Sequence, residues 1–182
     1  IGADLCLNSL RLANNFREAH GLRRAFFCQM NLFRPCFKEE VFDLVVSNGV
    51  LHHTSDPKRG FHGISKLVKP GGMIVIGLYH RYGRIATDIR RVLFNLSGDR
   101  LKSLDSRVVN DQIDKVRRET WFLDQYKNPH ESKHTIREVL TWFEEAGFEF
   151  VSSIPKNTLF SPISIDESIF AQDALGNTAE QT

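Results

Sequence analysis

Three polar residues, Asp4, Asn31 and Asn48, each stand at the end of a short, mostly apolar stretch of the chain. In open α/β sheets, ligands bind at the carboxyl ends of the strands, where such residues would lie. An aspartate in that position can accept hydrogen bonds from both hydroxyls of a ribose. An asparagine can donate to and accept from an adenine edge. These residue types at strand ends make the three residues candidates for contacts with a ligand.

Each of these residues also has a simpler interpretation. Asp4 is equally suited to a helix N-cap or a turn, and Asn31 is of a type used most often in turns. Gly49 follows a strand and permits a close approach of the backbone to a ligand, while Asn48 supplies a polar side chain at the same edge. We keep the turn and ligand interpretations open at this point.

His52 and His53 are candidates for acid–base chemistry, because histidine titrates near neutral pH. Adjacent histidines cannot easily share one role, so we expect one to pack against the loop and the other to line the pocket. The sequence shows neither a carboxylate partner nor a nucleophile for them. The catalytic residue is therefore left unassigned, and the candidates are His53, His80, Tyr79 and His134.

Strands and helices must alternate to bring these residues together. Apolar runs at 42–47 and 73–79, with a shorter run near 23–29, are typical of strands buried on both faces of a parallel sheet. A helical face at Leu10, Ala13 and Phe16, ended by Gly21, precedes them. Such alternation predicts an α/β fold with right-handed crossovers.

The helix between the last two strands has clear end signals. Asp56 is an N-cap residue and Pro57 suits the first helical position. Apolar residues then repeat at helical spacing: Phe61, Ile64, Leu67 and Val68. Pro70-Gly71-Gly72 is expected to end this helix and turn the chain into the strand at 73–79.

Residues 81–130 are helical, charged and poorly periodic, with a break at 95–99, and we interpret them as an insertion that forms a lid. The core pattern then returns with a capping box at Thr135 and Glu138. The apolar face of that helix is Val139, Leu140, Phe143 and Ala146, and Gly147 ends it. A strand is expected at 148–154, and a polar, flexible tail at 166–182.

Composition limits the function classes. The 182 residues suit one domain, the net charge of +2 argues against a dedicated nucleic-acid binder, and no apolar run has the length of a membrane span. The three cysteines, Cys6, Cys28 and Cys36, form no metal-ligand pattern, so we expect no metal site. An odd, low count is typical of reduced thiols in a cytoplasmic protein.

Several segments together resemble the class I methyltransferases. FDLVVSNGVLHHTSDP at 42–57 and LVKPGGMIVIGLYH at 67–80 resemble the fourth and fifth strands of that family. GADLCLNSLRLA at 2–13 resembles the second strand with its helix, and MNLF at 30–33 the loop after the third strand. The resemblance covers the core portions of residues 1–80 and 132–160.

The resemblance implies a Rossmann-like fold, a mostly parallel sheet flanked by helices with a helical insertion, and S-adenosylmethionine as cofactor. Asp4 matches the ribose ligand, and Asn31 the position, usually aspartate, that contacts the adenine amino group. Leu32 would add a backbone N–H and an apolar wall. Asn48 and Gly49 match the stretch that lines the methionine end of the cofactor. The first strand and its Gly-x-Gly loop are lacking, and their place would be before Ile1.

The function that this implies is methyl transfer to a small-molecule or lipid-like acceptor, with Arg81 and Arg84 able to hold an acidic group on it. Solvated charges on a helical face are the more common use of such arginines. The main alternative is a truncated, non-catalytic fragment that binds no cofactor. A nicotinamide-dependent Rossmann enzyme is disfavoured by the Lys-Pro-Gly-Gly turn. A vacant central position between the second and fourth strands would also favour self-association.

Overall fold

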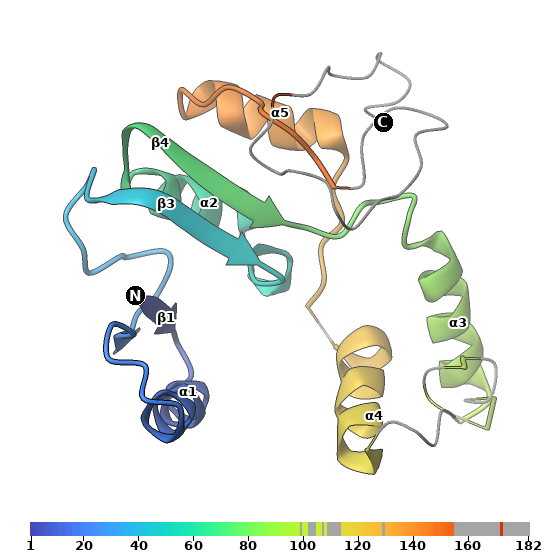
Figure 1. The fold of residues 1–182 in the computed structure, drawn as a ribbon. Helices are drawn as coiled ribbons and strands as arrows, with labels where there is room; N and C mark the ends of the chain where they lie inside the picture. The colour runs from blue at the N-terminus through green and yellow to red at the C-terminus, as the bar shows by residue number, and fades with distance from the viewer. Residues whose placement is uncertain are drawn as a thin grey trace. The chain divides into compact units, whose positions relative to one another are not determined.

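The structure is a computed structural model that describes residues 1–98, 100–101, 105–106, 108, 114–128, 130–154 and 172. It divides into two compact units (Figure 1). Unit 1 consists of Ile1–Leu51 and Asp56–Ile76, and unit 2 of His52–Ser55 and Gly77–Thr182. We describe each unit by itself. The expectation of one domain that carries an insertion stays a prediction.

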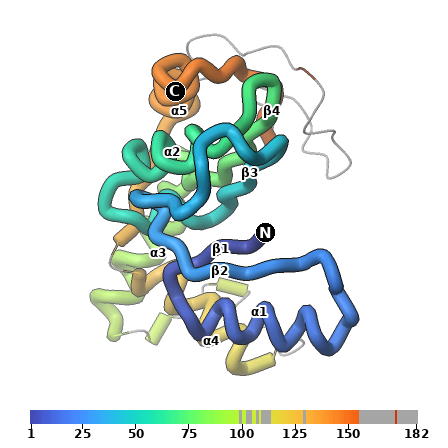
Figure 2. Tube along the Cα trace, turned by 90° about the vertical axis from the view of Figure 1, so that its left-hand side faces the viewer, coloured from blue at the N-terminus to red at the C-terminus, as the bar shows by residue number. Residues whose placement is uncertain are grey.

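Unit 1 contains two pairs of strands and two helices. In chain order its elements are β1 (Gly2–Asp4), α1 (Leu7–Ala19), β2 (Phe27–Gln29), β3 (Phe42–Asn48), the start of the short 3₁₀ helix η1 (Leu51–His53), α2 (Pro57–Ser65) and β4 (Val68–Gly77). β1 and β2 run parallel, with Ala3 opposite Cys28 and Asp4 opposite Gln29, and Figure 2 shows them side by side. The strands expected at 42–47 and near 23–29 are confirmed, the second as three residues only.

The hydrogen-bonded ladder is interrupted between the two strand pairs. Among the described residues, β1 pairs only with β2, and β3 pairs only with β4. The arrows of β3 and β4 run in the same direction in Figure 1. The expected α/β fold of parallel strands flanked by helices is confirmed.

The N-terminus of α2 is formed as its sequence predicts, whereas its C-terminus is not. The Asp56 carboxylate accepts a hydrogen bond from the Arg59 N–H at 3.0 Å, and Pro57 is the first helical residue. The helix ends at Ser65, and β4 already begins at Val68. The carbonyl of Leu67 accepts hydrogen bonds from the N–H groups at 41 and 42. Pairing with the start of β3 therefore takes the place of another helical turn.

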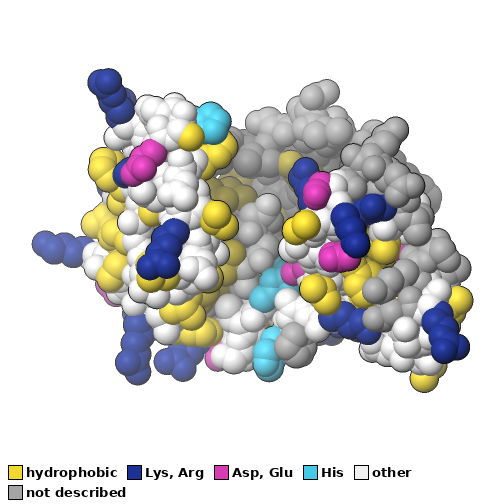
Figure 3. Space-filling model, turned by 90° about the horizontal axis from the view of Figure 1, so that it is seen from below, with side chains coloured by type: hydrophobic (Ala, Val, Ile, Leu, Met, Phe, Trp, Pro, Cys, Tyr) yellow, Lys and Arg dark blue, Asp and Glu magenta, His cyan; other side chains and the backbone are white. Residues whose placement is uncertain are grey.

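Helix α1 ends before Gly21 as expected, but its predicted apolar face is only partly buried. Leu10 is buried, whereas Phe16 is 58% exposed and stacks on His20 with ring centroids 3.9 Å apart. Other apolar side chains on or beside this helix are exposed as well: Leu5, Leu7 and Leu12. Figure 3 shows hydrophobic side chains on the surface among lysines and arginines. Large exposed apolar patches are typical of surfaces that contact another element or another chain.

Unit 2 is helical in its described part. Its elements are α3 (Ile85–Leu96), α4 (Lys115–Phe122), the π-helical turn η3 (Leu123–Lys127) and α5 (Ile136–Glu145). Phe94, Phe122 and Tyr126, one from each of the first three, form an aromatic core with ring centroids 4.8 to 5.6 Å apart. The helical character and the break after Leu96 are therefore as predicted for 81–130, while the lid role stays a prediction.

Helix α5 confirms the capping box and corrects the strand expected after it. The Thr135 hydroxyl accepts from the Glu138 N–H, and the Glu138 carboxylate accepts from the Thr135 N–H. At the other end Gly147 has a φ of 76°, and the Phe148 N–H donates back to the Phe143 carbonyl at 2.8 Å. That bond closes the helix by a Schellman turn. Residues 148–153 form no strand, because the first N–H of the segment is used by this turn and no described strand pairs with it. The tail expected at 166–182 lies outside the described residues, apart from residue 172.

We expect the 182-residue chain to self-associate through the strand edges that face the interruption. Leu44 and Val46 on β3 are 45% and 60% exposed, and an open strand edge with apolar side chains is a template for pairing. Val46→Lys should raise the monomer fraction in light scattering, because a charge on an edge strand opposes pairing. Leu12→Lys removes an apolar side chain that is 71% exposed from helix α1 and serves as control. A wild-type chain that stays monomeric at all concentrations would contradict the prediction.

Candidate functional site

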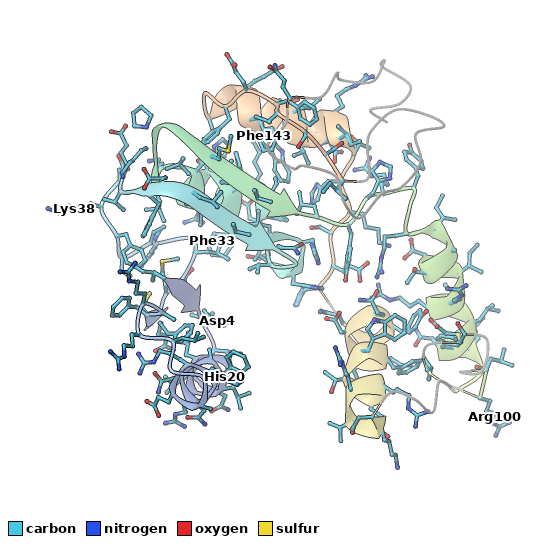
Figure 4. The ribbon with its side chains drawn as sticks, viewed as in Figure 1. Asp4, His20, Phe33, Lys38, Arg100 and Phe143 are labelled. Atoms are coloured by element: carbon cyan, nitrogen blue, oxygen red, sulfur yellow. The ribbon has the colours of Figure 1, made fainter. Side chains whose placement is uncertain are left out.

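Asp4 is the last residue of β1, as predicted, and its side chain is exposed. Figure 4 marks it at the tip of the strand. Its Oδ1 accepts a hydrogen bond from the Cys6 N–H at 2.7 Å, so the turn role considered in the sequence analysis is present. A carboxylate has about four acceptor positions. This turn uses one of them, and the group can still accept hydrogen bonds from a ligand.

Asn31 lies beside Asp4 at the same sheet edge. The Met30 N–H donates to the Asp4 carbonyl at 3.0 Å, which continues the parallel pairing of β1 and β2 to this point. The side-chain oxygen of Asn31 accepts from the Phe33 N–H at 2.9 Å, and its carbonyl accepts from the Arg34 N–H. Asn31 is therefore a turn residue whose exposed amide also has an N–H₂ donor.

Leu32 packs toward α2, and two glycines of that helix make room for it. A Cβ added at Gly60 would lie 2.5 Å from Leu32 Cδ1 and 3.0 Å from Leu51 Cδ2. A Cβ at Gly63 would lie 2.5 Å from the Leu32 carbonyl oxygen. The two separations of 2.5 Å are shorter than the contacts that real Cβ atoms make. The loops that follow β2 and β3 therefore meet at one face of α2, and a larger residue at either glycine would push them away.

Asn48 ends β3, and Gly49 follows it with a φ of 74°. This left-handed conformation strongly favours glycine. Both residues are exposed, whereas the preceding Ser47 is buried. The structure thus places Asp4, Asn31, Asn48 and Gly49 at or just after the carboxyl ends of the strands of unit 1. Their role as cofactor ligands, like that of Leu32, stays a prediction.

In unit 2, His52 is the packed member of the histidine pair. Its ring stacks on Tyr79 with centroids 3.9 Å apart, and the residue is only 2% exposed. Burial, with a smaller contribution from His53, lowers the pKa of His52 from 6.5 to about 4, so the ring is neutral near neutral pH. Within the described part of the chain, neither ring nitrogen has a hydrogen-bond partner.

His53 has polar partners that the sequence did not reveal. Asn128 Nδ2 lies 3.0 Å from His53 Nδ1, and Asp124 Oδ1 lies 3.8 Å from His53 Nε2. The Asn128 oxygen accepts from the His130 N–H, so the nitrogen of the amide faces His53. Nδ1 also lies 3.2 Å from the His130 carbonyl oxygen, so whether it donates or accepts depends on the tautomer of the ring. A histidine oriented by a carboxylate is an arrangement suited to proton transfer.

Arg84 is not the solvated charge that its helical pattern suggested. Its guanidinium lies 3.9 Å over the Tyr79 ring. The His52 ring also lies 3.9 Å from the Tyr79 ring. The guanidinium and the imidazole must therefore cover opposite faces of the tyrosine. Arg84 also contacts the Glu131 carboxylate at 3.1 Å, and its side chain is 11% exposed. It is therefore held in a buried ion pair.

Glu131 is the centre of this network, and the sequence analysis missed it. Its side chain is 1% exposed and lies 3.1 Å from Arg84, 3.0 Å from Arg91 and 3.9 Å from Lys133. A buried carboxylate of this kind is stable only when it is paired and hydrogen-bonded. An acidic residue just after the charged insertion at 81–130 was the one available signal.

The remaining candidates are engaged locally. Arg81 pairs with Glu138 at 2.6 Å. His134 lies 2.9 Å from the Ser132 hydroxyl and 3.3 Å from Glu138, and burial lowers its pKa. His80 Nδ1 accepts from the Gly83 N–H at 3.2 Å. These contacts hold the segments after β4 and before α5 together, as does the bond from the His134 N–H to the Tyr79 carbonyl.

The described residues contain no group of three or more His, Cys, Asp or Glu side chains arranged to hold a metal ion. None of the helices that they form combines the length and the apolar composition needed to cross a membrane.

The chain is similar to known proteins over part of its length. Residues 1–76 match a family model described as a methyltransferase domain. An uncharacterized protein of Synechococcus is 25% identical over 81% of this chain and 41% of its own length.

Solved structures share the fold at low identity. PKMT2 from Rickettsia typhi, solved in complex with AdoHcy, superposes with a TM-score of 0.63 at 14% identity, over 80% of this chain and 33% of that one. The YcgJ protein from Bacillus subtilis gives 0.53 at 15% identity, over 80% and 50%. The chain thus spans half or less of the length of these relatives.

The first prediction from the site concerns Glu131. Glu131→Ala should lower the free energy of unfolding by about 3 kcal/mol, because it leaves Arg84 and Arg91 without their buried counter-charge. Urea unfolding followed by circular dichroism measures the change. Glu144→Ala removes an exposed carboxylate from α5 and should change the stability by less than about 0.5 kcal/mol. Equal effects of the two substitutions would mean that the network does not stabilise the fold.

The second prediction concerns pH. The unfolded His52 takes up a proton near pH 6.5, whereas the folded one does so only near pH 4. The unfolded state therefore binds more protons between these values, and stability should fall as the pH is lowered from about 6.5 to about 4. His52→Phe keeps a ring on Tyr79 but does not titrate, so its thermal melting point should depend less on pH in this window. His134 contributes in the same direction and leaves a residual slope. Identical slopes for variant and wild type would refute the assignment.

Proposed function

We propose that the chain forms part of an enzyme that uses S-adenosylmethionine. The premise is that residues 1–76 belong to the methyltransferase domain family and that the chain has the fold of class I methyltransferases. The observation that carries the proposal is the convergence of strand-end loops in unit 1. The Met30–Asp4 hydrogen bond joins the ends of β1 and β2, and α2 joins the loops after β2 and β3.

The residues at this edge have the chemistry that the cofactor requires. Asp4 would accept hydrogen bonds from the ribose hydroxyls, and Asn31 would bind the adenine edge through its amide. Leu32 would supply a backbone N–H beside that base. Asn48 would contact the methionine end, where Gly49 lets the backbone approach closely. The exposure of Asp4, Asn31, Asn48 and Gly49 fits this assignment, because a ligand can reach them.

S-adenosylmethionine supplies, when bound, a methyl group on a positively charged sulfur, and its transfer is an in-line displacement. The protein mainly has to align the acceptor with that group. A base is needed only when the acceptor must lose a proton. Among the candidates in unit 2, His53 lies beside Asp124 and Asn128, and it would be the one to hold such a proton.

We further propose a small-molecule or lipid-like acceptor and a cytoplasmic location. The structure argues against one expectation about the acceptor, namely that Arg81 and Arg84 hold an acidic group on it. Arg84 and Arg81 are paired with Glu131 and Glu138, and so they are not free to hold an acidic group. We therefore assign no charge to the acceptor from these arginines.

Titration calorimetry with S-adenosylhomocysteine tests the proposal. In a version with a strand and a Gly-x-Gly loop fused before Ile1, we expect micromolar affinity, about −8 kcal/mol. Asp4→Ala should weaken binding roughly tenfold, because charge-assisted hydrogen bonds to the ribose are lost. Asp4→Asn retains an acceptor for the Cys6 N–H and separates the turn from ligand binding.

Asp43→Ala is the matched control, since it removes an exposed carboxylate from the opposite end of β3, where it pairs with Lys69 at 2.8 Å. Binding should be unchanged in this variant. Absence of heat in the extended protein would refute the proposal and favour the non-binding alternative.

A further inference from the structure

Helix α3 is oriented the opposite way from an ordinary surface helix. Arg91 on this helix lies 3.0 Å from the buried Glu131. Asp88 pairs with Lys133, and Phe94 is fully buried in the aromatic core. Surface helices normally turn their apolar face inward and their charges to solvent. In α3, polar contacts and one aromatic ring hold the helix to the rest of unit 2.

The outer side of α3 carries a stripe of aliphatic side chains. This α3 stripe consists of four residues, each between 50% and 81% exposed: Ile85, Ile89, Val92 and Leu96. At 3.6 residues per turn, their spacing places all four within about 60° around the helix axis. Tyr82 is also half exposed, and its carbonyl accepts from the Ile85 N–H at the start of the stripe. The apolar surface therefore follows the whole length of the helix.

Positive charge lies at the C-terminal end of the α3 stripe. Lys127 Nζ donates at 2.8 Å to the side-chain oxygen of Asn95, which precedes Leu96. The N–H of the exposed Arg100 donates to the C-cap carbonyl of α3, and Figure 4 marks Arg100 at this end of the helix. Residues 81–128 contain 11 Lys and Arg against 7 Asp and Glu, a net charge of +4, whereas the whole chain has +2. The face thus fits a surface that is both apolar and anionic.

We propose that the α3 stripe binds the surface of an anionic lipid membrane. The helix lies in the plane of the interface, with its aliphatic side chains among the lipid chains and with Arg100 and Lys127 at the headgroup phosphates. Tyr82 suits the boundary, because its ring is apolar and its hydroxyl is polar. Binding of this kind needs no helix that spans the membrane. It stands apart from the proposed function, since it requires no cofactor.

A second copy of the chain or a protein partner fits this face less well. A two-fold dimer places the same patch against itself, which would bring two basic segments together at a cost in free energy. A stable interface between proteins takes about 20–30 residues from each side, whereas the stripe and Tyr82 together are five residues. A bilayer accepts a single amphipathic helix without a matching groove.

Vesicle flotation tests the proposal on the 182-residue chain. The vesicles contain phosphatidylcholine alone or phosphatidylcholine with phosphatidylglycerol, and flotation separates bound protein from aggregates, which sink. We expect the chain to float with the anionic vesicles and to have a partition coefficient roughly tenfold lower for the neutral ones. High salt should weaken the binding to anionic vesicles, because it screens exposed charges.

Variants identify the surface involved. Ile89→Glu places a charge in the middle of the α3 stripe and should lower the partition coefficient for anionic vesicles about tenfold or more. Leu12→Glu is the matched control, since it adds the same charge at an exposed apolar side chain of α1, and it should bind as wild type. Arg100→Gln should weaken binding to anionic vesicles only. Circular dichroism checks that each variant is folded, and Arg100→Gln decides the matter if Ile89→Glu is not.

Three results would overturn the proposal: no flotation of the wild-type chain, equal binding to neutral and anionic vesicles, or equal effects of Ile89→Glu and Leu12→Glu. If the wild-type chain does not float and Ile89→Glu raises the monomer fraction in light scattering, the stripe binds a second copy of the chain instead.

Discussion

The close contact between α2 and the loop after β2 is the constraint on which the candidate site depends. Gly60 and Gly63 expose bare backbone on one helix face, and Leu32 occupies the space that their side chains would fill. Leu51, which is fully buried, meets the same glycine from the loop after β3. Among the described residues, no strand of one pair is hydrogen-bonded to a strand of the other. Side-chain packing on α2 therefore fixes the positions of the ends of β2 and β3.

Unit 2 is organised on a different physical principle. Its centre is a buried carboxylate with three cations around it, and the stack of Arg84, Tyr79 and His52 extends from one of those cations. Buried ionic networks add little stability when compared with an apolar core of equal volume. Removing one member of such a network, however, strongly destabilises the fold. They therefore fix one arrangement of the segments that carry them, here α3 and the residues before α5.

Local signals in the sequence were sufficient for the elements whose ends depend on nearby residues. The Asp56 cap with Pro57 and the capping box of Thr135 and Glu138 are both present. The strand ends that carry Asp4 and Asn48 were also predictable, because each follows from an apolar run of the right length. The resemblance to methyltransferases was carried by the same segments.

Features that depend on pairing between distant residues were not predictable in this way. The end of α2 at Ser65 is set by the Leu67 carbonyl pairing with the start of β3. The Glu131 network joins residues up to 47 positions apart, and no periodic pattern marks such a pair.

The division into two units has a spectroscopic consequence. The chain has two tryptophans, and both Trp121 and Trp142 belong to unit 2, where Trp142 is buried against His134. Tryptophan fluorescence therefore reports on unit 2 alone, and unit 1 is silent at excitation wavelengths selective for indole. A single tryptophan introduced at Phe61, the fully buried aromatic residue of α2, would give unit 1 its own emission. Whether the two signals change together or in sequence during unfolding would then measure the cooperativity between the units.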